Sequence, residues 1–276
     1  MPSIASRISA TFAALHSRRH MAFMPFVTAG DPDMEATLAV VRELAAAGVD
    51  LIEIGFPYSD PIADGPVIQA SYTRALAKGL HVRDIFAGIA SLPSDELPPL
   101  VAMVSFAIVF RMGAEQFLSA ARDAGFAGLI VPDLPGDEAA ELAEAARIQG
   151  LDLIELIAPT TPPERARRIL ATASGFVYCI SVAGTTGVRN ELPPELVDQL
   201  RELRARTDLP LAVGFGISRP EQVDALRGHA EGIIVGSAIV RRMGPMGEGG
   251  PAQAEALAEI GRFAAEMVAA AHHPRE

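Results

Sequence analysis

Short apolar runs alternate along the chain with longer stretches of mixed polarity. Eight runs rich in Val, Ile, Leu and Phe lie at residues 22–28, 50–55, 100–106, 128–133, 152–158, 176–182, 209–215 and 232–238. Continuous apolarity over four to eight residues is typical of strands buried on both faces, as in parallel sheets. The pattern therefore predicts eight strands of this kind.

Helical spacing of the apolar residues marks several of the intervening stretches. It is clearest at residues 33–48, 114–125, 136–150, 163–174 and 193–207, where apolar positions recur every three or four residues. Gly48, Gly125 and Gly150 close three of these stretches, and glycine takes the left-handed conformation that ends a helix at little cost. The first 20 residues also have the pattern of an amphipathic helix.

Strands that alternate with helices form either a doubly wound sheet or a closed (β/α)₈ barrel. Eight such units within 276 residues favour the barrel. We therefore predict an α/β fold, a (β/α)₈ TIM barrel with an extra N-terminal helix, built as a single domain over residues 1–276. In such a barrel the loops that follow the strands carry the ligand chemistry.

Charge and composition exclude several classes of partner. The formal net charge is −11 and no basic stripe interrupts it, so a phosphate-backbone partner is not expected. The apolar stretch 97–110 is shorter than the roughly 20 residues that span a bilayer, and the N-terminus lacks a signal-peptide pattern. Cys179 is the only cysteine, which excludes an internal disulfide and a multi-cysteine metal site. We expect a cytoplasmic protein without nucleic-acid or membrane binding.

The most informative segment is LIEIGFPYSDPIADGP, residues 51–66. Alternate residues of a strand face opposite sides, so Glu53 lies on the face opposite to Ile52 and Ile54. If the isoleucines pack on the surrounding helices, Glu53 points into the barrel, where loss of water raises its pKa and makes it a proton donor near neutral pH. The alternative is a structural carboxylate paired with an arginine.

Two further carboxylates follow in the same segment. Asp64 lies in the turn sequence ADGP and Asp60 in YSDP, where an aspartate has either a turn-capping or a functional role. Residues 56–79 are interpreted as one unusually long loop that can bring Asp64 over the barrel mouth beside Glu53, with Asp60 at the rim. Residues 181–194, rich in glycine and small polar residues, are interpreted as a lid.

Glycine clusters follow the seventh and eighth predicted strands. They are VGFGIS, with Gly214 and Gly216, and VGSAIV, with Gly236 and Ser237. Barrels that bind phosphorylated substrates often hold the anion on backbone N–H groups at these two places. The clusters therefore favour a phosphorylated substrate.

The positions of the lysine and the histidines exclude further catalytic mechanisms. Lys78 is the only lysine and is placed at a helix end, whereas a Schiff-base aldolase needs a lysine on a barrel strand. The six histidines fall outside the predicted strand ends, so a multi-histidine metal site is not expected there. With Schiff-base and metal-dependent mechanisms excluded, acid–base catalysis by carboxylates is the remaining mechanism for cleavage of a carbon–carbon bond.

Six segments together resemble the tryptophan synthase alpha subunit family. They occur in order over about residues 20–245 and read PFVTAGDPD (25–33), IEIGFPYSDPIADGPVIQ (52–69), GLIVPDLP (128–135), SVAGTTGVR (181–189), GFGIS (214–218) and GSAIV (236–240). The resemblance implies a barrel that cleaves indole-3-glycerol phosphate to indole and glyceraldehyde 3-phosphate in tryptophan biosynthesis, without a cofactor in this subunit.

The resemblance also assigns roles to residues. Glu53 matches the general acid and base, and Asp64 matches the carboxylate that holds the indole N–H. The remaining matched positions bind substrate: Phe26 and Tyr178 in the indole pocket, Thr186 in the lid, and Gly187, Gly214, Gly216, Gly236 and Ser237 around the phosphate. The implied partner is a pyridoxal-phosphate beta subunit, in an alpha2-beta2 heterotetramer.

One region departs from the family pattern. After the third strand the family usually has a Tyr and an Asn two residues apart, where this chain has Ser105 and Ala107. Two alternatives to the lyase also stay open: a weakly catalytic subunit that acts mainly as allosteric activator of a beta subunit, and another phosphate-handling barrel enzyme, such as an isomerase, with its base on the second strand.

Overall fold

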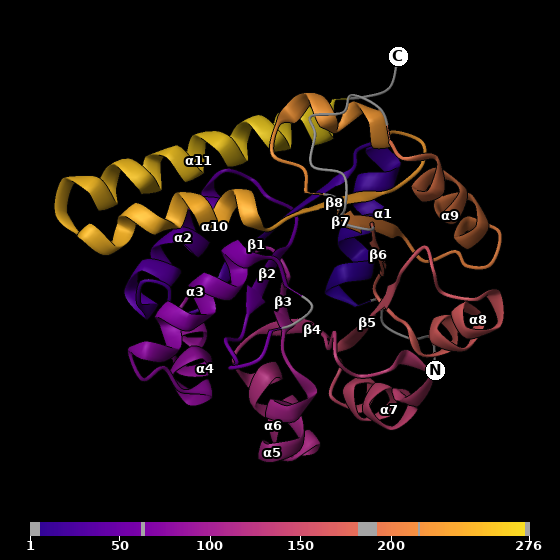
Figure 1. The fold of residues 1–276 in the computed structure, drawn as a ribbon, viewed down its shortest axis with the longest axis horizontal. Coiled ribbons are helices and arrows are strands. Elements are labelled where there is room, and N and C mark those ends of the chain that lie inside the picture. The colour runs from indigo at the N-terminus through magenta and orange to yellow at the C-terminus, as the bar shows by residue number, and fades with distance from the viewer. Residues whose placement is uncertain (1–5, 62–63, 182–191, 215, 274–276) are drawn as a thin grey trace.

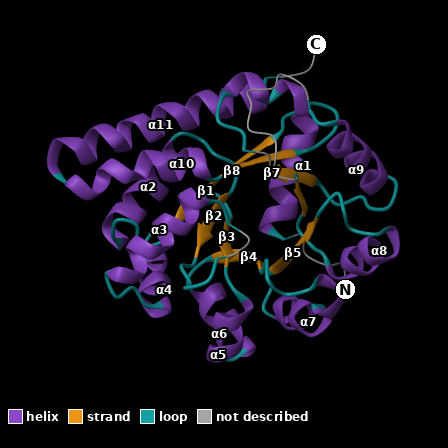
Figure 2. Ribbon diagram, in the orientation of Figure 1, coloured by secondary structure: helices purple, strands orange, loops and turns teal. Residues whose placement is uncertain are grey.

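The computed structural model describes residues 6–61, 64–181, 192–214 and 216–273, and its eight parallel strands close a barrel in chain order (Figure 1; Figure 2). The strands are β1 (Ala22–Thr28), β2 (Ile52–Gly55), β3 (Leu100–Met103), β4 (Phe126–Ile130), β5 (Asp152–Ile157), β6 (Val177–Ile180), β7 (Leu211–Gly214) and β8 (Gly232–Val235). Strand β1 pairs with β8, which closes the ring. The predicted TIM barrel is confirmed.

Helices surround this ring on the outside (Figure 2). They are α2 (Met34–Ala46), α3 (Pro66–Ala77), α4 (Val82–Ala90), α5 (Phe106–Met112), α6 (Ala114–Asp123), α7 (Ala140–Ile148), α8 (Pro163–Thr172), α9 (Pro194–Arg204), α10 (Ser237–Met243) and α11 (Gly250–His272). Short 3₁₀ turns lie at Gly136–Glu138, Pro220–Gln222, Asp224–Leu226 and Gly244–Glu248. In the part of the chain described, no helix is both long and apolar enough to cross a membrane.

The predicted helix ends follow from local chemistry. The Asp33 side chain accepts a hydrogen bond from the Ala36 N–H at 2.8 Å and so caps α2, satisfying a donor that a helix start leaves unpaired. Gly48, Gly125 and Gly150 have φ values of +80°, +94° and +74°. The left-handed glycines predicted after these helices are confirmed.

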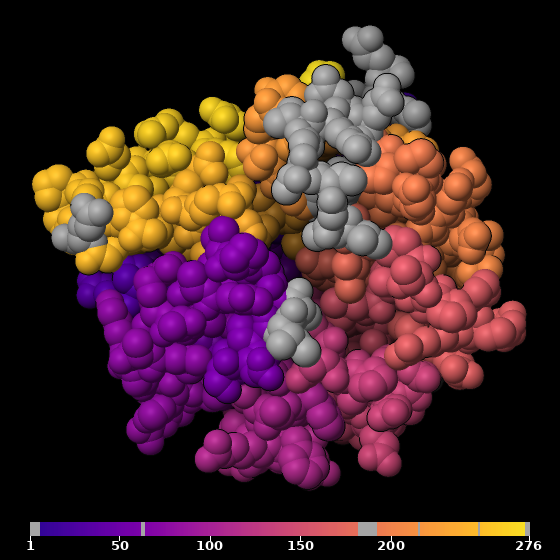
Figure 3. Space-filling model, viewed as in Figure 1, coloured from indigo at the N-terminus to yellow at the C-terminus, as the bar shows by residue number. Residues whose placement is uncertain are grey.

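Two apolar layers hold the barrel. The inner layer fills the ring with side chains such as Met24, Leu51 and Ile154, and the predicted N-terminal helix, α1 (Arg7–Arg18), adds Ile8 and Phe12 to it. The outer layer lies between the strands and the surrounding helices. Helix α11 packs against α2, so the last helix lies beside an early segment of the chain (Figure 3).

The structure corrects two boundaries expected from sequence. Residues 56–79 are not one long loop, because α3 occupies Pro66–Ala77 and leaves a loop of residues 56–65. The apolar run 100–106 is not strand throughout, because β3 ends at Met103 and Ser105 caps α5, accepting from the Ala107 N–H at 3.2 Å. Apolarity continues across that junction, so it could not mark the strand end.

Candidate active site at the carboxyl ends of the strands

Glu53 is buried inside the barrel. Leu51 belongs to the inner apolar layer, whereas Ile52 and Ile54 belong to the outer layer, so the alternation places Glu53 on the inner face. The residue is 1% exposed, and both carboxyl oxygens are buried without a hydrogen-bond partner among the described residues. The arginine-paired alternative is therefore not found in the described structure.

Burial determines the protonation state of Glu53. Loss of water raises the pKa of its carboxyl to about 8, since a charge transferred from water into an apolar interior is disfavoured. Near neutral pH the carboxyl is mostly protonated. It can therefore donate a proton to a group bound at the mouth of the barrel.

Asp64 lies at the end of the loop that follows β2. Its N–H donates to the Pro61 carbonyl at 3.1 Å, and the next two residues, Gly65 and Pro66, form the N-cap and first residue of α3. The Asp64 side chain is not the helix cap, because the N-cap position belongs to Gly65. Partial burial raises the pKa of Asp64 to about 6, which leaves it mostly ionised at neutral pH. Asp60, in contrast, is exposed.

The charges of both carboxylates act on two tyrosines, the buried Tyr72 and the partly buried Tyr178. The pKa of Tyr178, on β6, is raised well above its ordinary value by burial, and further by the charges of Glu53 and Asp64. Burial raises the pKa of Tyr72, on α3, and the charges of Asp64 and Glu53 act in the same direction. The structure thus brings Glu53 and Asp64 to the same end of the barrel.

Two glycines make room for the aromatic rings at this end. A Cβ at Gly55 would lie 2.3 Å from the Phe26 ring and 2.8 Å from the Tyr72 hydroxyl. A Cβ at Gly214 would lie 2.6 Å from the Tyr178 hydroxyl. Phe26 is directly across the β1–β2 register from Glu53. Aromatic rings from β1, α3 and β6 therefore pack over these two strand ends, near Glu53.

The predicted anion-binding residues lie at two adjacent strand ends. Gly214 ends β7, and the exposed Gly216 has a φ of +65°. Gly236 is the N-cap of α10 and Ser237 is its first residue. A Cβ at Gly236 would lie 3.7 Å from Phe26 Cβ, so this strand end lies beside Phe26. Thr186 and Gly187, with most of the predicted lid, lie outside the described residues.

The loop with the unusual Ser105 is fixed by a neighbouring aspartate. The Ser105 hydroxyl donates to Asp133 Oδ2 at 2.6 Å, and the Phe106 N–H donates to Asp133 Oδ1 at 2.7 Å. Asp133 comes from the loop after β4 and was not singled out in the sequence. Its position at the carboxyl end of the predicted fourth strand, 128–133, was the available signal.

A second buried carboxylate lies outside the barrel interior. Glu155, on β5, shares a face with Leu153 and Ile157 of the outer layer, and Oε1 accepts from the Thr172 hydroxyl at 3.2 Å. Burial raises its pKa to about 7. A Cβ at Gly136 would approach Oε2 to 2.9 Å, so Glu155 contacts the helical layer rather than the mouth.

Comparisons with known proteins agree on one family. A sequence model described as "Tryptophan synthase alpha chain" matches residues 12–271. Tryptophan synthase alpha chains of Gloeobacter violaceus and Rhodopirellula baltica are 45% and 47% identical over 270 and 239 residues. The first alignment covers 97% of this chain and 96% of the relative, and the second covers 86% of each.

Solved structures give the same result. The tryptophan synthase subunit alpha of Legionella pneumophila has a TM-score of 0.86 at 33% identity, covering 97% of this chain and 98% of that one. A chain of Mycobacterium tuberculosis tryptophan synthase has a TM-score of 0.86 at 34% identity, covering 98% and 100%.

Proposed function

The chain belongs to the tryptophan synthase alpha chain family, and we propose that Glu53 and Asp64 are the residues with which it carries out the family's reaction. That reaction is the reversible retro-aldol cleavage of indole-3-glycerol phosphate to indole and glyceraldehyde 3-phosphate in tryptophan biosynthesis. The chain is accordingly a lyase. The observation that carries the residue assignment is the buried, unpartnered carboxyl of Glu53.

Glu53 moves the protons of the reaction. Its carboxyl gives a proton to C3 of the indole ring, which makes the ring a cation. The resulting carboxylate takes the proton of the adjacent glycerol hydroxyl, whose carbon becomes the aldehyde, and the electrons of the broken carbon–carbon bond return to the ring. Glu53 ends the cycle protonated, as a pKa of about 8 favours at neutral pH.

Asp64 stabilises the ring while it is charged. As an ionised carboxylate it accepts a hydrogen bond from the indole N–H and opposes the positive charge that develops there. Its partial burial strengthens that interaction, because a charge acts over a longer range where water is excluded. Both pKa values are raised, but that of Glu53 lies above neutrality and that of Asp64 below it. This difference suits an acid and an ionised carboxylate with different roles.

The remaining site residues bind the substrate. Phe26 and Tyr178 line the indole pocket, and Thr186 belongs to the lid. The phosphate is held at the carboxyl ends of β6, β7 and β8 by backbone N–H groups and one hydroxyl. The residues are Gly187, Gly214, Gly216, Gly236 and Ser237.

A beta subunit is the partner that family membership implies, and we propose an alpha2-beta2 heterotetramer. A large exposed aromatic side chain supports an interface at the carboxyl ends of the strands. Phe110, on α5, is 77% exposed and its ring lies 6.1 Å from that of Phe106, and aromatic residues are enriched in interface cores. As an enzyme of amino-acid biosynthesis, the protein is proposed to work in the cytoplasm.

The proposed function is tested by supplying indole-3-glycerol phosphate to the purified chain, alone and with a beta subunit, without added metal or cofactor for the alpha reaction. Indole and glyceraldehyde 3-phosphate should appear in equal amounts. A chain that binds the beta subunit and raises its activity while releasing no indole under either condition would instead support the alternative of an allosteric activator.

A further inference from the structure

Helix α3 is tied to the first strand and the loop after it by two polar contacts. The Ser71 and Thr28 hydroxyls are 2.7 Å apart in the core. The Arg74 guanidinium donates to both oxygens of Asp31 at 2.9 and 2.6 Å, and Asp31 is 1% exposed. Bidentate, charge-assisted pairs are strong and directional, so α3 is a fixed support beside the barrel mouth.

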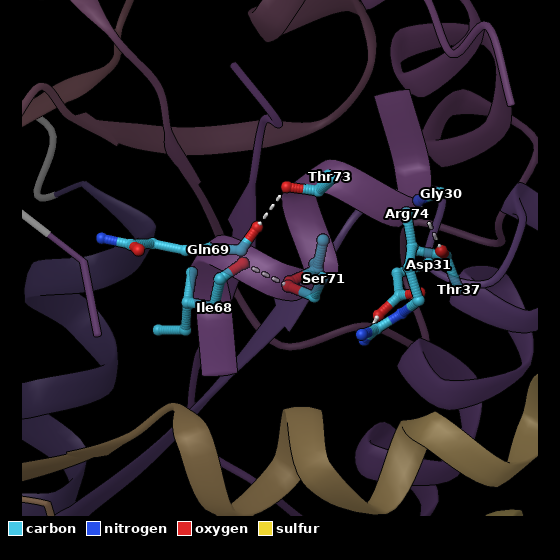
Figure 4. Close-up of polar contacts among 9 residues, drawn as sticks. Gly30, Asp31, Thr37, Ile68, Gln69, Ser71, Thr73 and Arg74 are labelled. Atoms are coloured by element: carbon cyan, nitrogen blue, oxygen red, sulfur yellow. Dashed lines mark hydrogen bonds and ion pairs between the residues drawn. The ribbon is translucent and has the colours of Figure 1, made fainter. Parts of the chain in front are cut away.

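Gln69 extends from the same helix, away from Arg74 (Figure 4). Its side-chain Nε2 donates to the Pro61 carbonyl at 3.1 Å and to the Asp64 carbonyl at 2.8 Å. A carbonyl oxygen only accepts hydrogen bonds, so only the amide nitrogen, with its two N–H groups, can satisfy both. One side chain therefore holds both ends of the turn from Pro61 to Asp64.

The contacts of Gln69 limit where Asp64 can lie. The turn is closed by the Asp64 N–H, which donates to the Pro61 carbonyl at 3.1 Å. The chain then enters α3 through Gly65 and Pro66, and proline allows only a narrow range of φ. The backbone of Asp64 is thus held on its N–H side by the turn and on its carbonyl side by Gln69.

We propose that Gln69 is a positioning residue for the lyase reaction: by holding the Pro61 and Asp64 carbonyls from α3, it sets the place of the Asp64 carboxylate over the barrel mouth. This inference rests on the proposed function of Asp64. Gln69 acts through Asp64: its amide N–H groups bind the Pro61 and Asp64 carbonyls, and the buried Glu53 carboxyl accepts no hydrogen bond from it. A displacement of about 1 Å in a catalytic group can lower turnover by roughly 10²-fold.

Gln69→Met removes both donors and keeps the length of the side chain, and Gln69→Glu replaces the amide nitrogen by an acceptor. Gln199 supplies a matched control, because its Nε2 donates to the Ile157 carbonyl at 2.9 Å in the outer layer. We expect Gln69→Met and Gln69→Glu to lower kcat by about 10- to 100-fold and to change KM little. Gln199→Met should lose at least as much thermal stability while keeping kcat within about twofold of wild type.

Amide hydrogen exchange supplies a readout that does not depend on activity. In Gln69→Met the Asp64 N–H should exchange about tenfold faster than in wild type, with no such change in Gln199→Met. If wild type is active and Gln69→Met keeps more than half of its kcat, or if the Asp64 exchange rate is unchanged, the positioning role is wrong while the proposed function stands. A wild-type chain that releases no indole would overturn both.

Discussion

Glu53 is the residue at which catalysis and stability oppose each other. Its carboxyl has no hydrogen-bond partner in the described structure, and burial raises its pKa to about 8. Because the folded-state pKa is above the unfolded value, the native state binds the proton more tightly. Stability from this group is therefore full below about pH 4.5 and is lost as pH rises to about 8.

Glu53→Gln should remove that loss. Between pH 6 and 9 the free energy of unfolding of wild type should fall relative to that of the variant, so that the variant is the more stable protein at pH 9 by an amount on the order of a few kcal/mol. Urea unfolding of both proteins across this range measures the difference. A constant difference between the two proteins at all pH values would mean that Glu53 does not titrate with a raised pKa.

The same group should shape the pH dependence of catalysis. If protonated Glu53 starts the reaction, kcat/KM for indole-3-glycerol phosphate should fall above pH about 8 as the free enzyme loses this proton. A pH–rate profile from pH 6.5 to 10 would locate the alkaline limb. A limb absent up to pH 10 is the contradictory result.

The face of Glu53 could be predicted because its surroundings are local: Ile52 and Ile54 flank it, so alternation places it opposite to them. The role of Asp64 came from the family resemblance, because its local sequence suits a turn cap equally well. Tyr72 and Gln69 were not predicted, because their roles depend on α3 lying against β1. That contact joins residues 43 positions apart, such as Thr28 and Ser71, and local periodicity does not report it.

At the scale of elements, the sequence of helix α3 explains why the length of the loop after β2 was overestimated. Its sequence, PVIQASYTRALA, buries Ser71 and Tyr72 side by side with Ala75, and buried polar and aromatic side chains weaken an amphipathic pattern. The five stretches with clean apolar spacing were predicted correctly, whereas α5 follows β3 without a clear break in polarity.

Gly55, on β2, leaves room for the ring of Phe26 on β1, and a substitution tests this requirement. In Gly55→Ala the new Cβ would lie 2.3 Å from the Phe26 ring, so the ring must move out of the predicted indole pocket. We expect kcat/KM to fall at least about tenfold and the free energy of unfolding to fall by about 1–3 kcal/mol.

Gly247→Ala is the control for that substitution. Gly247 lies in the 3₁₀ turn Gly244–Glu248, its φ is outside the left-handed region, and a Cβ added there would come no closer than 3.5 Å to a described residue, Pro32, so activity and stability should stay close to wild type. Steady-state kinetics and thermal unfolding of the two variants make the comparison. Equal behaviour of both would show that Gly55 is not required for the pocket.

At the scale of the molecule, the closed ring joins the two ends of the chain. Strand β1 pairs with β8, and α11 packs against α2, so the first and last strands cannot separate without opening the barrel. We propose on this basis that residues 1–276 form a single domain. The barrel itself could be predicted because eight strand–helix units admit few topologies.

The departure from the family pattern at Ser105 and Ala107 affects the expected coupling to a beta subunit. The Ser105 hydroxyl is occupied by Asp133, and the exposed Ala107 carries no polar group. We therefore expect activation by a beta subunit to be weaker than is usual in the family, and Ala107→Asn to increase it. Indole release with saturating beta subunit measures this. Strong activation of wild type that the substitution leaves unchanged would contradict the expectation.

The most direct measurement compares two buried carboxyls of the same chain. Glu53 and Glu155 both have raised pKa values, but only Glu53 lies inside the barrel mouth. Turnover of indole-3-glycerol phosphate should fall by roughly 10²–10⁴-fold in Glu53→Gln and stay within about twofold of wild type in Glu155→Gln. A Glu53→Gln enzyme that keeps a tenth of wild-type turnover, or equal losses in both variants, would contradict the assignment of Glu53 as the catalytic acid.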